Sequence, residues 1–456
     1  MARQEARPSS DKRSHIVLIP GFAGFDALGQ LEYYGGLTKV FQDVQAQNAV
    51  LHYFDNFPTA AVVTRARRLR EYLAKRLARG EISKRDDVTL IGHSTGGLDI
   101  RCLLWDLHEL DREERLILVD GVKVKPMKLT GRIHRVVFLS VPHWGTNIAD
   151  WVKSHRVLRK ALIENLRGAV AGSQLPPVEQ FESAIAGGTA SITGAPIYEA
   201  VRDALDEANE DIGEQTPYRE AEAQEAASEL ELYLRHMASD FRAIDDLTSR
   251  APRISKRGDK EPMSPAHFHA RWRQTELGQL RNIEFRSYVT VGKRPFRFDP
   301  GQPAPVWDLA KLWTYPEISK DNALSAGTDF MYRACYRACA GGPFNSPTKS
   351  REQAKRLSPK EPIEVWDNDG IVNTLSMFWP LGKHVLVHAD HMDIVGQYQP
   401  LHAEPGGGRK FRTYDLLKSD SGFHDKIFRE IWNDIFAFCL GGRNAHQTLA
   451  ASSGGE

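Results

Sequence analysis

The sequence predicts an α/β fold, in which a mostly parallel central sheet has helices on both faces. Three observations predict it. Short apolar segments alternate with amphipathic helical patterns over residues 15–150, one apolar segment runs directly into a Gly-x-Ser-x-Gly motif at 92–96, and strand-like segments return after residue 281. Strands that are separated by helices pair in parallel, and helices then cover both faces of the sheet.

The individual elements follow from local patterns. Strands are expected at 15–21, 50–54, 88–91, 136–141, 283–291 and 385–387, and a hairpin is expected to turn at Asp120-Gly121. A helix is expected over 59–79, with arginines and lysines around one apolar stripe of Val62, Ala66, Leu69, Leu73 and Leu77. Further helices are expected from the motif to about 108 and over 425–440, where Ile427, Ile431, Ile435 and Phe438 face inward.

Composition limits the domain organisation and the classes of partner. The 456 residues divide into polar tails at 1–14 and 441–456, two halves of one core at 15–150 and 281–440, and a helical cap inserted at 151–280. Lys plus Arg number 60 and Asp plus Glu 59, so no net field attracts nucleic acid. No apolar run reaches the ~18–20 residues that span a bilayer. The oligomeric state is left open.

Cysteine usage and the N-terminal residues indicate the compartment. Only four cysteines occur, and Cys335 and Cys339 lie four apart in a helical pattern that suits neither a disulfide nor a zinc site. Buried reduced thiols are therefore expected. The N-terminus has no apolar segment of the kind found in secretory signals. A cytoplasmic location is expected for the chain as written, and a secreted one if a signal was removed.

The segment from Val88 to Gly97 is the most informative part of the chain. A strand that leads into Gly-x-Ser-x-Gly and then a helix is a nucleophile elbow, in which Ser94 occupies a strained turn. Gly92 and Gly96 are needed where a Cβ would collide. The expected oxyanion-hole donors are the backbone N–H of Thr95 and that of Phe22, in the loop after the first strand.

The serine also needs a base and an acid, which follow it along the chain in this fold. Among sixteen histidines, position near the end of the chain leaves five, and His391 comes directly after an apolar strand. Asp367 and Asp369 lie shortly before it, and the Asp369-Gly370 pair predicts a tight loop. Spacing alone does not separate the two aspartates.

Several of these segments resemble a family, the large bacterial true lipases of the α/β-hydrolase superfamily, most closely the thermostable lipases of thermophilic bacilli. The similar segments are 16–24 with Tyr33-Tyr34-Gly35-Gly36, the elbow at 92–96, and 141–146. Residues 368–377 resemble the loop with the catalytic acid, and 390–393 the segment around the catalytic histidine. The resemblance thus implies Asp369 as the acid and His391 as the base, within an α/β-hydrolase fold.

The resemblance also bears on metals and on a lid. It implies a structural calcium ion bound in part by Asp393, whereas the histidines of the family's zinc-binding insertion are missing here, so no zinc is expected. No cofactor is needed for the chemistry. The helical pattern from Asn147 to Val170 has an apolar stripe of Ile148, Trp151, Leu158, Leu162 and Leu166. It is expected to form a lid, and a surface helix packed on the core is the alternative.

The function expected from these residues is hydrolysis of lipophilic carboxylic esters, such as triglycerides or short-to-medium acyl esters, through an acyl-enzyme on Ser94. An acyltransferase with the same triad and a polyester hydrolase are the alternatives among enzymes. A catalytically inactive hydrolase fold used as a binding module is the alternative outside them. Partners are expected to be ester substrates and, transiently, a lipid interface.

Overall fold

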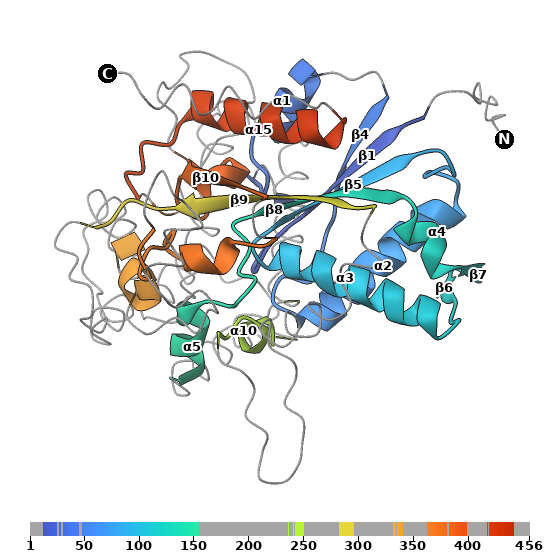
Figure 1. Ribbon diagram of the computed structural model, residues 1–456, viewed down its shortest axis with the longest axis horizontal. Coiled ribbons are helices and arrows are strands. Elements are labelled where there is room, and N and C mark those ends of the chain that lie inside the picture. The colour runs from blue at the N-terminus through green and yellow to red at the C-terminus, as the bar shows by residue number, and fades with distance from the viewer. Residues whose placement is uncertain are drawn as a thin grey trace, which may run out of the picture.

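A sheet of six strands, all paired in parallel, forms the centre of the computed structural model (Figure 1). The structure describes residues 12–154, 236–249, 282–295, 332–340, 363–398 and 417–441, with short gaps inside most of these ranges. The strand order is β10-β9-β8-β5-β1-β4. The strands are β1 (Ser14–Ile19), β4 (Ala49–Tyr53), β5 (Asp87–His93), β8 (Ile133–Leu139), β9 (Glu284–Val291) and β10 (His384–His388). The predicted fold class is confirmed.

Helices cover both faces of this sheet (Figure 1). On one face lie α1 (Leu37–Val44) and α15 (Asp425–Cys439); on the other lie α2 (Val62–Ala78), α3 (Thr95–Arg112) and α4 (Pro126–Thr130). Two antiparallel pairs are β2 (Ala27–Leu28) with β3 (Leu31–Glu32), and β6 (Ile117–Val119) with β7 (Val122–Val124). Short helices are α5 (Asn147–Ser154), α10 (Ala243–Asp246), η1 (Thr374–Met377) and η2 (Asp393–Val395).

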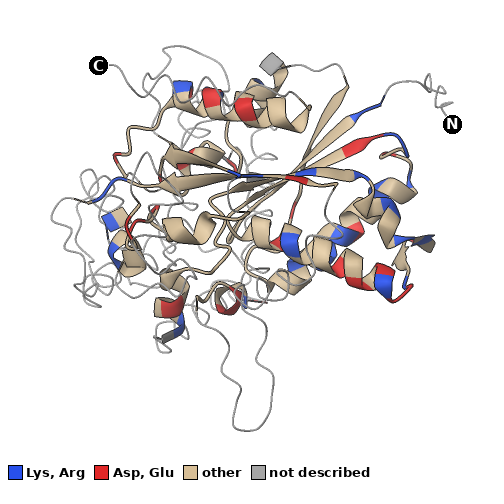
Figure 2. Cartoon of the chain, in the orientation of Figure 1, with Lys and Arg blue, Asp and Glu red and all other residues tan. Residues whose placement is uncertain are grey.

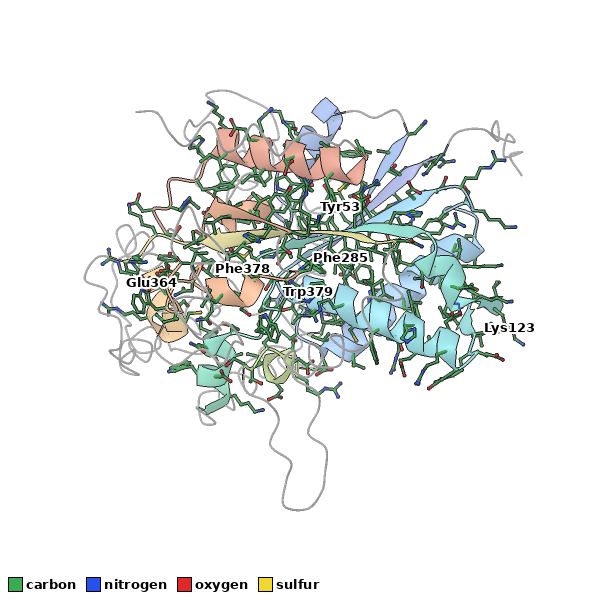
Figure 3. The ribbon with its side chains drawn as sticks, in the orientation of Figure 1. Tyr53, Lys123, Phe285, Glu364, Phe378 and Trp379 are labelled. Atoms are coloured by element: carbon green, nitrogen blue, oxygen red, sulfur yellow. The ribbon has the colours of Figure 1, made fainter. Side chains whose placement is uncertain are left out.

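The apolar residues of the central strands make the core. Residues 16–19 of β1 are fully buried, as expected for a parallel strand covered on both faces. On α15 the predicted stripe is correct at Ile431, Ile435 and Phe438, while Ile427 is only partly buried. The buried surface of α15 is wider than predicted and also includes Phe428, Trp432 and Phe436. Phe285 of β9 packs edge-on against Trp379, with ring centroids 5.4 Å apart (Figure 3).

Two local predictions have clear outcomes. The hairpin turns at Asp120-Gly121 as predicted, with φ of +48° and +78° at these residues, the backbone that a tight two-residue turn requires. The prediction that all arginines of α2 lie outside its buried stripe is wrong, because Arg65 is fully buried. Arg65 follows Val62 by three residues and precedes Leu69 by four, so it lies on the apolar side of the helix.

The order of the strands determines where a site can form. The chain places β4 on one side of β1 and then β5 and β8 on the other. At such a change of direction the loops leave the carboxyl ends of two adjacent strands toward opposite faces, which opens a crevice between them. The loop after β1 and the turn after β5 both lie at this position. The predicted oxyanion loop and nucleophile elbow are therefore neighbours.

Most of the predicted cap at 151–280 lies outside the described residues. The predicted lid helix begins as expected, since α5 covers Asn147–Ser154, across the predicted boundary at 150/151; its continuation to 170 is not described. α5 is fixed to α10 by an ion pair between Lys153 and Asp245 at 3.7 Å. The carboxylate of Asp150 accepts hydrogen bonds from Ser249, in the segment after α10. The start of the predicted lid is thus anchored.

Charged residues of both signs alternate along the outer helices (Figure 2). Within the described part of the chain, no helix is both long and apolar enough to span a membrane.

All four cysteines are free thiols and buried, as predicted. Burial raises the pKa of the Cys335 and Cys439 thiols to about 12.

Candidate active site

Ser94 is the single residue between the end of β5 and the start of α3. Its backbone is strained, with φ of +51° and ψ of −127°. Its N–H donates to the carbonyl of Leu139 in β8 at 2.8 Å, which holds the turn against the sheet. A Cβ on Gly96 would lie 2.4 Å from the carbonyl oxygen of Ile19, so only glycine fits there. The predicted nucleophile elbow is present in the structure.

The loop after β1 lies directly against this elbow. A Cβ on Gly21 would be 2.7 Å from the Cβ of Ser94, so the two backbones approach more closely than any side chain allows. The N–H of Ala23 donates to the Pro58 carbonyl at 2.8 Å and that of Gly24 to Gly21 at 3.2 Å. Phe22, the predicted donor, lies between these anchored residues. The loop therefore adjoins Ser94, as an oxyanion loop must.

The N–H of Thr95, the other predicted donor, lies in the first turn of α3. The first N–H groups of a helix have no partner inside the helix, and they point out along its axis. The partial positive charge of the helix N-terminus adds to their effect on an anion. Thr95 is fully buried and follows Ser94 directly, so a charge that forms beside this N–H would lie in a region of low dielectric.

A buried hydrogen bond joins His391 to Asp369, the acid that the resemblance implies. His391 Nδ1 is 2.7 Å from Asp369 Oδ2, and the two side chains are 4% and 0% exposed. The same carboxylate accepts the hydroxyl of Thr290 at 2.7 Å and the N–H of Val372 at 2.8 Å. A carboxylate only accepts, so Nδ1 of His391 carries the proton. Nε2 is thereby the nitrogen that can accept one.

His391 lies beside the elbow. Its ring centroid is 4.7 Å from that of His93, the residue before Ser94. The loop that carries it leaves β10, and the His391 N–H donates to the Asp369 carbonyl at 2.9 Å. Three loops at one edge of the sheet thus bring Ser94, His391 and Asp369 together, in the chain order Ser, Asp, His.

Asp367 has a different environment from Asp369. Its carboxylate forms a two-pronged contact with the half-exposed guanidinium of Arg294, at 3.0 and 3.2 Å. It also accepts the N–H of Glu364 at 2.8 Å. Asp367 therefore binds Arg294 and the start of its own loop. Of the two aspartates, Asp369 is the one that contacts His391.

The carboxylate of Asp393 accepts the N–H of Asp390 and the hydroxyl of Ser421, both at 2.8 Å. Asp390 in turn accepts the hydroxyl of Ser419 at 2.6 Å. Calcium takes six to eight oxygen ligands. Among the described residues no group of three or more His, Cys, Asp or Glu side chains is arranged to hold a metal ion. The calcium and zinc predictions stay untested, and no step below passes through a metal.

Three further side chains contact the site and were not assigned a role from the sequence. The guanidinium of Arg65 donates to the carbonyls of Pro20 and Gly21 at 2.7 and 3.0 Å, and to buried Asp99 at 2.9 Å. Tyr33 and His93 contact the oxyanion loop and the histidine loop. A sequence signal existed for Arg65, since a cation on the apolar stripe of a helix requires a buried partner.

The parallel sheet, the elbow after β5 and the order Ser, Asp, His along the chain are the features of the α/β-hydrolase fold, and the protein has this fold. No family model matches the sequence, and no curated relative matches it.

Solved structures similar to this chain include three with related descriptions. Staphylococcus hyicus lipase is 14% identical with a TM-score of 0.47, and the match covers 95% of this chain and 98% of that one. Lipase 1 from Pelosinus fermentans is 17% identical with a TM-score of 0.42, over 85% and 94% of the chains. A metagenomic carboxyl esterase is 12% identical with a TM-score of 0.39, over 96% and 79%. Likenesses this weak assign no activity.

Proposed function

We propose that this protein is a serine hydrolase of carboxylic esters, with Ser94 as nucleophile, His391 as general base and Asp369 as the residue that orients the base. The observation that carries the proposal is the buried Asp369–His391 hydrogen bond next to the strained turn at Ser94. A strained serine in a plain structural turn would need neither a histidine of fixed tautomer nor a buried carboxylate behind it.

The proposed reaction has two acyl transfers. Ser94 Oγ attacks the ester carbonyl carbon while its proton passes to His391 Nε2, and the resulting oxyanion accepts the N–H groups of Phe22 and Thr95. The carbon–oxygen bond to the alcohol then breaks, and the alcohol leaves with the proton from His391. Water repeats the attack on the acyl-enzyme through the same base and releases the acid.

Lipophilic esters are the proposed substrates, and a lid formed by the chain from Asn147 to Val170 is part of this proposal. An oil–water interface would stabilise an open lid, because its apolar stripe is then exposed to lipid rather than water. The rate on a sparingly soluble triglyceride is therefore expected to rise abruptly when an emulsion forms. If the rate instead rose smoothly with triglyceride concentration through the solubility limit, the enzyme would be an esterase without interfacial activation.

A series of p-nitrophenyl esters from acetate to palmitate tests the proposed activity. The wild-type protein is expected to hydrolyse members of the series, and Ser94→Ala is expected to lose on the order of 10³–10⁶ in kcat while it stays folded. Product analysis with added alcohol separates hydrolysis from acyl transfer. The proposal would be refuted if the wild type turned over no ester, or if Ser94→Ala were as active as the wild type.

A further inference from the structure

A continuous chain of hydrogen bonds runs behind the site through Tyr33 and His93. The N–H of Gly21 donates to the Tyr33 hydroxyl oxygen at 2.9 Å. Tyr33 Oη lies 2.6 Å from His93 Nδ1, and His93 Nε2 lies 2.9 Å from the carbonyl oxygen of His391. The chain thus joins the oxyanion loop, the residue before the nucleophile and the backbone of the base.

The direction of every hydrogen bond in this chain is determined. A carbonyl oxygen only accepts, so Nε2 of His93 carries a proton. Burial, together with the nearby His391, lowers the pKa of His93 well below its ordinary value, and the ring is neutral. Nδ1 of His93 therefore accepts a hydrogen bond from the Tyr33 hydroxyl. The Tyr33 oxygen in turn accepts the N–H of Gly21.

Tyr33 also fixes the position of the oxyanion loop relative to Ser94. A Cβ on Gly21 would lie 2.7 Å from the Tyr33 hydroxyl as well as 2.7 Å from the Cβ of Ser94. Gly21 is thus enclosed between the two side chains, and its N–H is fixed by Tyr33. The next residue along the loop is Phe22, the proposed oxyanion donor. An oxyanion donor must be within about 2.7–3.1 Å of the charged oxygen, so small displacements of this loop matter.

We propose that Tyr33 and His93 form a positioning pair, which sets the distance between the oxyanion donor at Phe22 and the base at His391. The proposal rests on the proposed hydrolase function and names residues beyond its triad and oxyanion hole. Neither side chain contacts the reacting atoms in the proposed reaction. Both act through the loops that they join, so their loss affects the transition state more than the binding of substrate.

Tyr33→Phe tests the pair because it removes only the hydroxyl. Its kcat on a soluble p-nitrophenyl ester is expected to fall about tenfold, roughly the effect of one buried hydrogen bond, with KM nearly unchanged. Rates are divided by the concentration of Ser94 titrated with a p-nitrophenyl phosphonate, so that unfolded protein does not count. Its melting temperature is expected to fall as well, because the buried hydroxyl makes two hydrogen bonds, so kcat per titrated serine is the readout that decides.

Tyr288→Phe is the matched control. Its hydroxyl is equally buried and donates to Asp434 of α15 at 2.5 Å, away from the three loops. This variant is expected to melt at a lower temperature and to keep the wild-type kcat per titrated serine. If Tyr33→Phe kept the wild-type kcat, or if Tyr288→Phe lost as much as Tyr33→Phe, the positioning pair would be wrong.

A double-mutant cycle with His93→Asn tests whether the two residues act as a unit. Once Tyr33→Phe has broken the chain, His93→Asn is expected to cost less kcat than it does in the wild type, whereas additive losses would contradict the pair. The parent proposal fails separately. A wild-type protein that neither turns over esters nor reacts with the phosphonate would overturn both, while an active wild type with an unaffected Tyr33→Phe would overturn the pair alone.

Discussion

Asp367 and Asp369 show how the surroundings of a residue decide its role. The two aspartates lie two positions apart on one loop, and both are buried. Asp367 meets the half-exposed cation of Arg294, whereas Asp369 meets His391 and the hydroxyl of Thr290. Of the two, only Asp369 contacts His391, so the proposed mechanism assigns to Asp369 the orientation of the base and the stabilisation of its imidazolium.

We therefore expect Asp369→Asn to lower kcat by on the order of 10³–10⁴, because the amide no longer fixes the tautomer of His391. Asp367→Asn is expected to change kcat by less than about tenfold, since an ion pair with a half-exposed partner contributes little. Steady-state kinetics on both purified, folded variants measures the ranking. The reverse order would show that Asp367, and not Asp369, orients the base.

Arg65 and Asp99 form an ion pair that is completely buried between α2 and α3. Burial raises the pKa of Asp99 to about 7, although the adjacent Arg65 lowers it. Removing the cation would leave Asp99 as an unpaired buried carboxylate, and the oxyanion loop would lose the donor to two of its carbonyls. The pair thus links the stability of the fold to the shape of the site.

Arg65→Met is expected to lower the free energy of unfolding by about 3–5 kcal/mol at neutral pH, the usual effect of removing one member of a buried pair. The loss is expected to be larger at pH 8 than at pH 5. Burial raises the pKa of Asp99, so at pH 5 the folded variant holds Asp99 in its neutral form. At pH 8 the same carboxyl is charged and has no cation beside it, and this unpaired buried charge destabilises the folded state. Thermal unfolding at the two pH values measures this, with Arg65→Met/Asp99→Asn as the control that loses the pH dependence. Equal losses in Arg65→Met at both pH values would contradict the account.

At the scale of elements, a buried histidine pair lies near the amino ends of the strands, at the end of the sheet away from Ser94. His15 at the start of β1 lies 2.9 Å from His52 of β4 and 3.2 Å from the carboxylate of Asp86, just before β5. Burial lowers the pKa of both histidines, that of His52 to about 4, where Arg76 and His15 also contribute. This cluster joins three adjacent strands while both rings are neutral.

The histidine pair predicts that the fold loses stability in mild acid. Unfolded histidines gain a proton near pH 6.5, but the folded pair resists it, so stability falls from about pH 6.5 down to pH 4. His52→Gln, which keeps a donor for His15, is expected to flatten this decline by up to about 1.4 kcal/mol per pH unit. Melting temperatures measured between pH 4 and 7 test it. An unchanged slope in His52→Gln would place the acid sensitivity elsewhere.

At the scale of the whole molecule, the features that the sequence predicts correctly are those with a local cause. The elbow needs a strand, two glycines and a helix within ten residues, and all of them are visible in one segment. The hairpin at Asp120-Gly121 is equally local. The sheet follows because its central strands carry short apolar segments, such as residues 16–19 of β1, which are buried on both faces.

The features that the sequence does not predict depend on contacts between distant residues. Arg65 is 45 positions from Pro20, and His93 is 298 positions from His391. No periodicity or spacing reports such a contact. Spacing likewise leaves Asp367 and Asp369 equivalent, and only the resemblance to bacterial lipases favours Asp369. Spacing along the helix places Arg65 on the apolar side, but it does not identify the carbonyls and the carboxylate that its guanidinium contacts.

The central claim is that Ser94 is an activated nucleophile, and one labelling experiment tests it most directly. A fluorophosphonate reacts with an activated serine through its phosphorus, displaces fluoride and leaves a stable adduct that mass spectrometry can assign to a peptide. We predict one adduct per folded chain, on Ser94, that is absent in Ser94→Ala and strongly reduced in His391→Ala. A folded wild-type protein with no adduct, or with its adduct on another residue, would contradict the account.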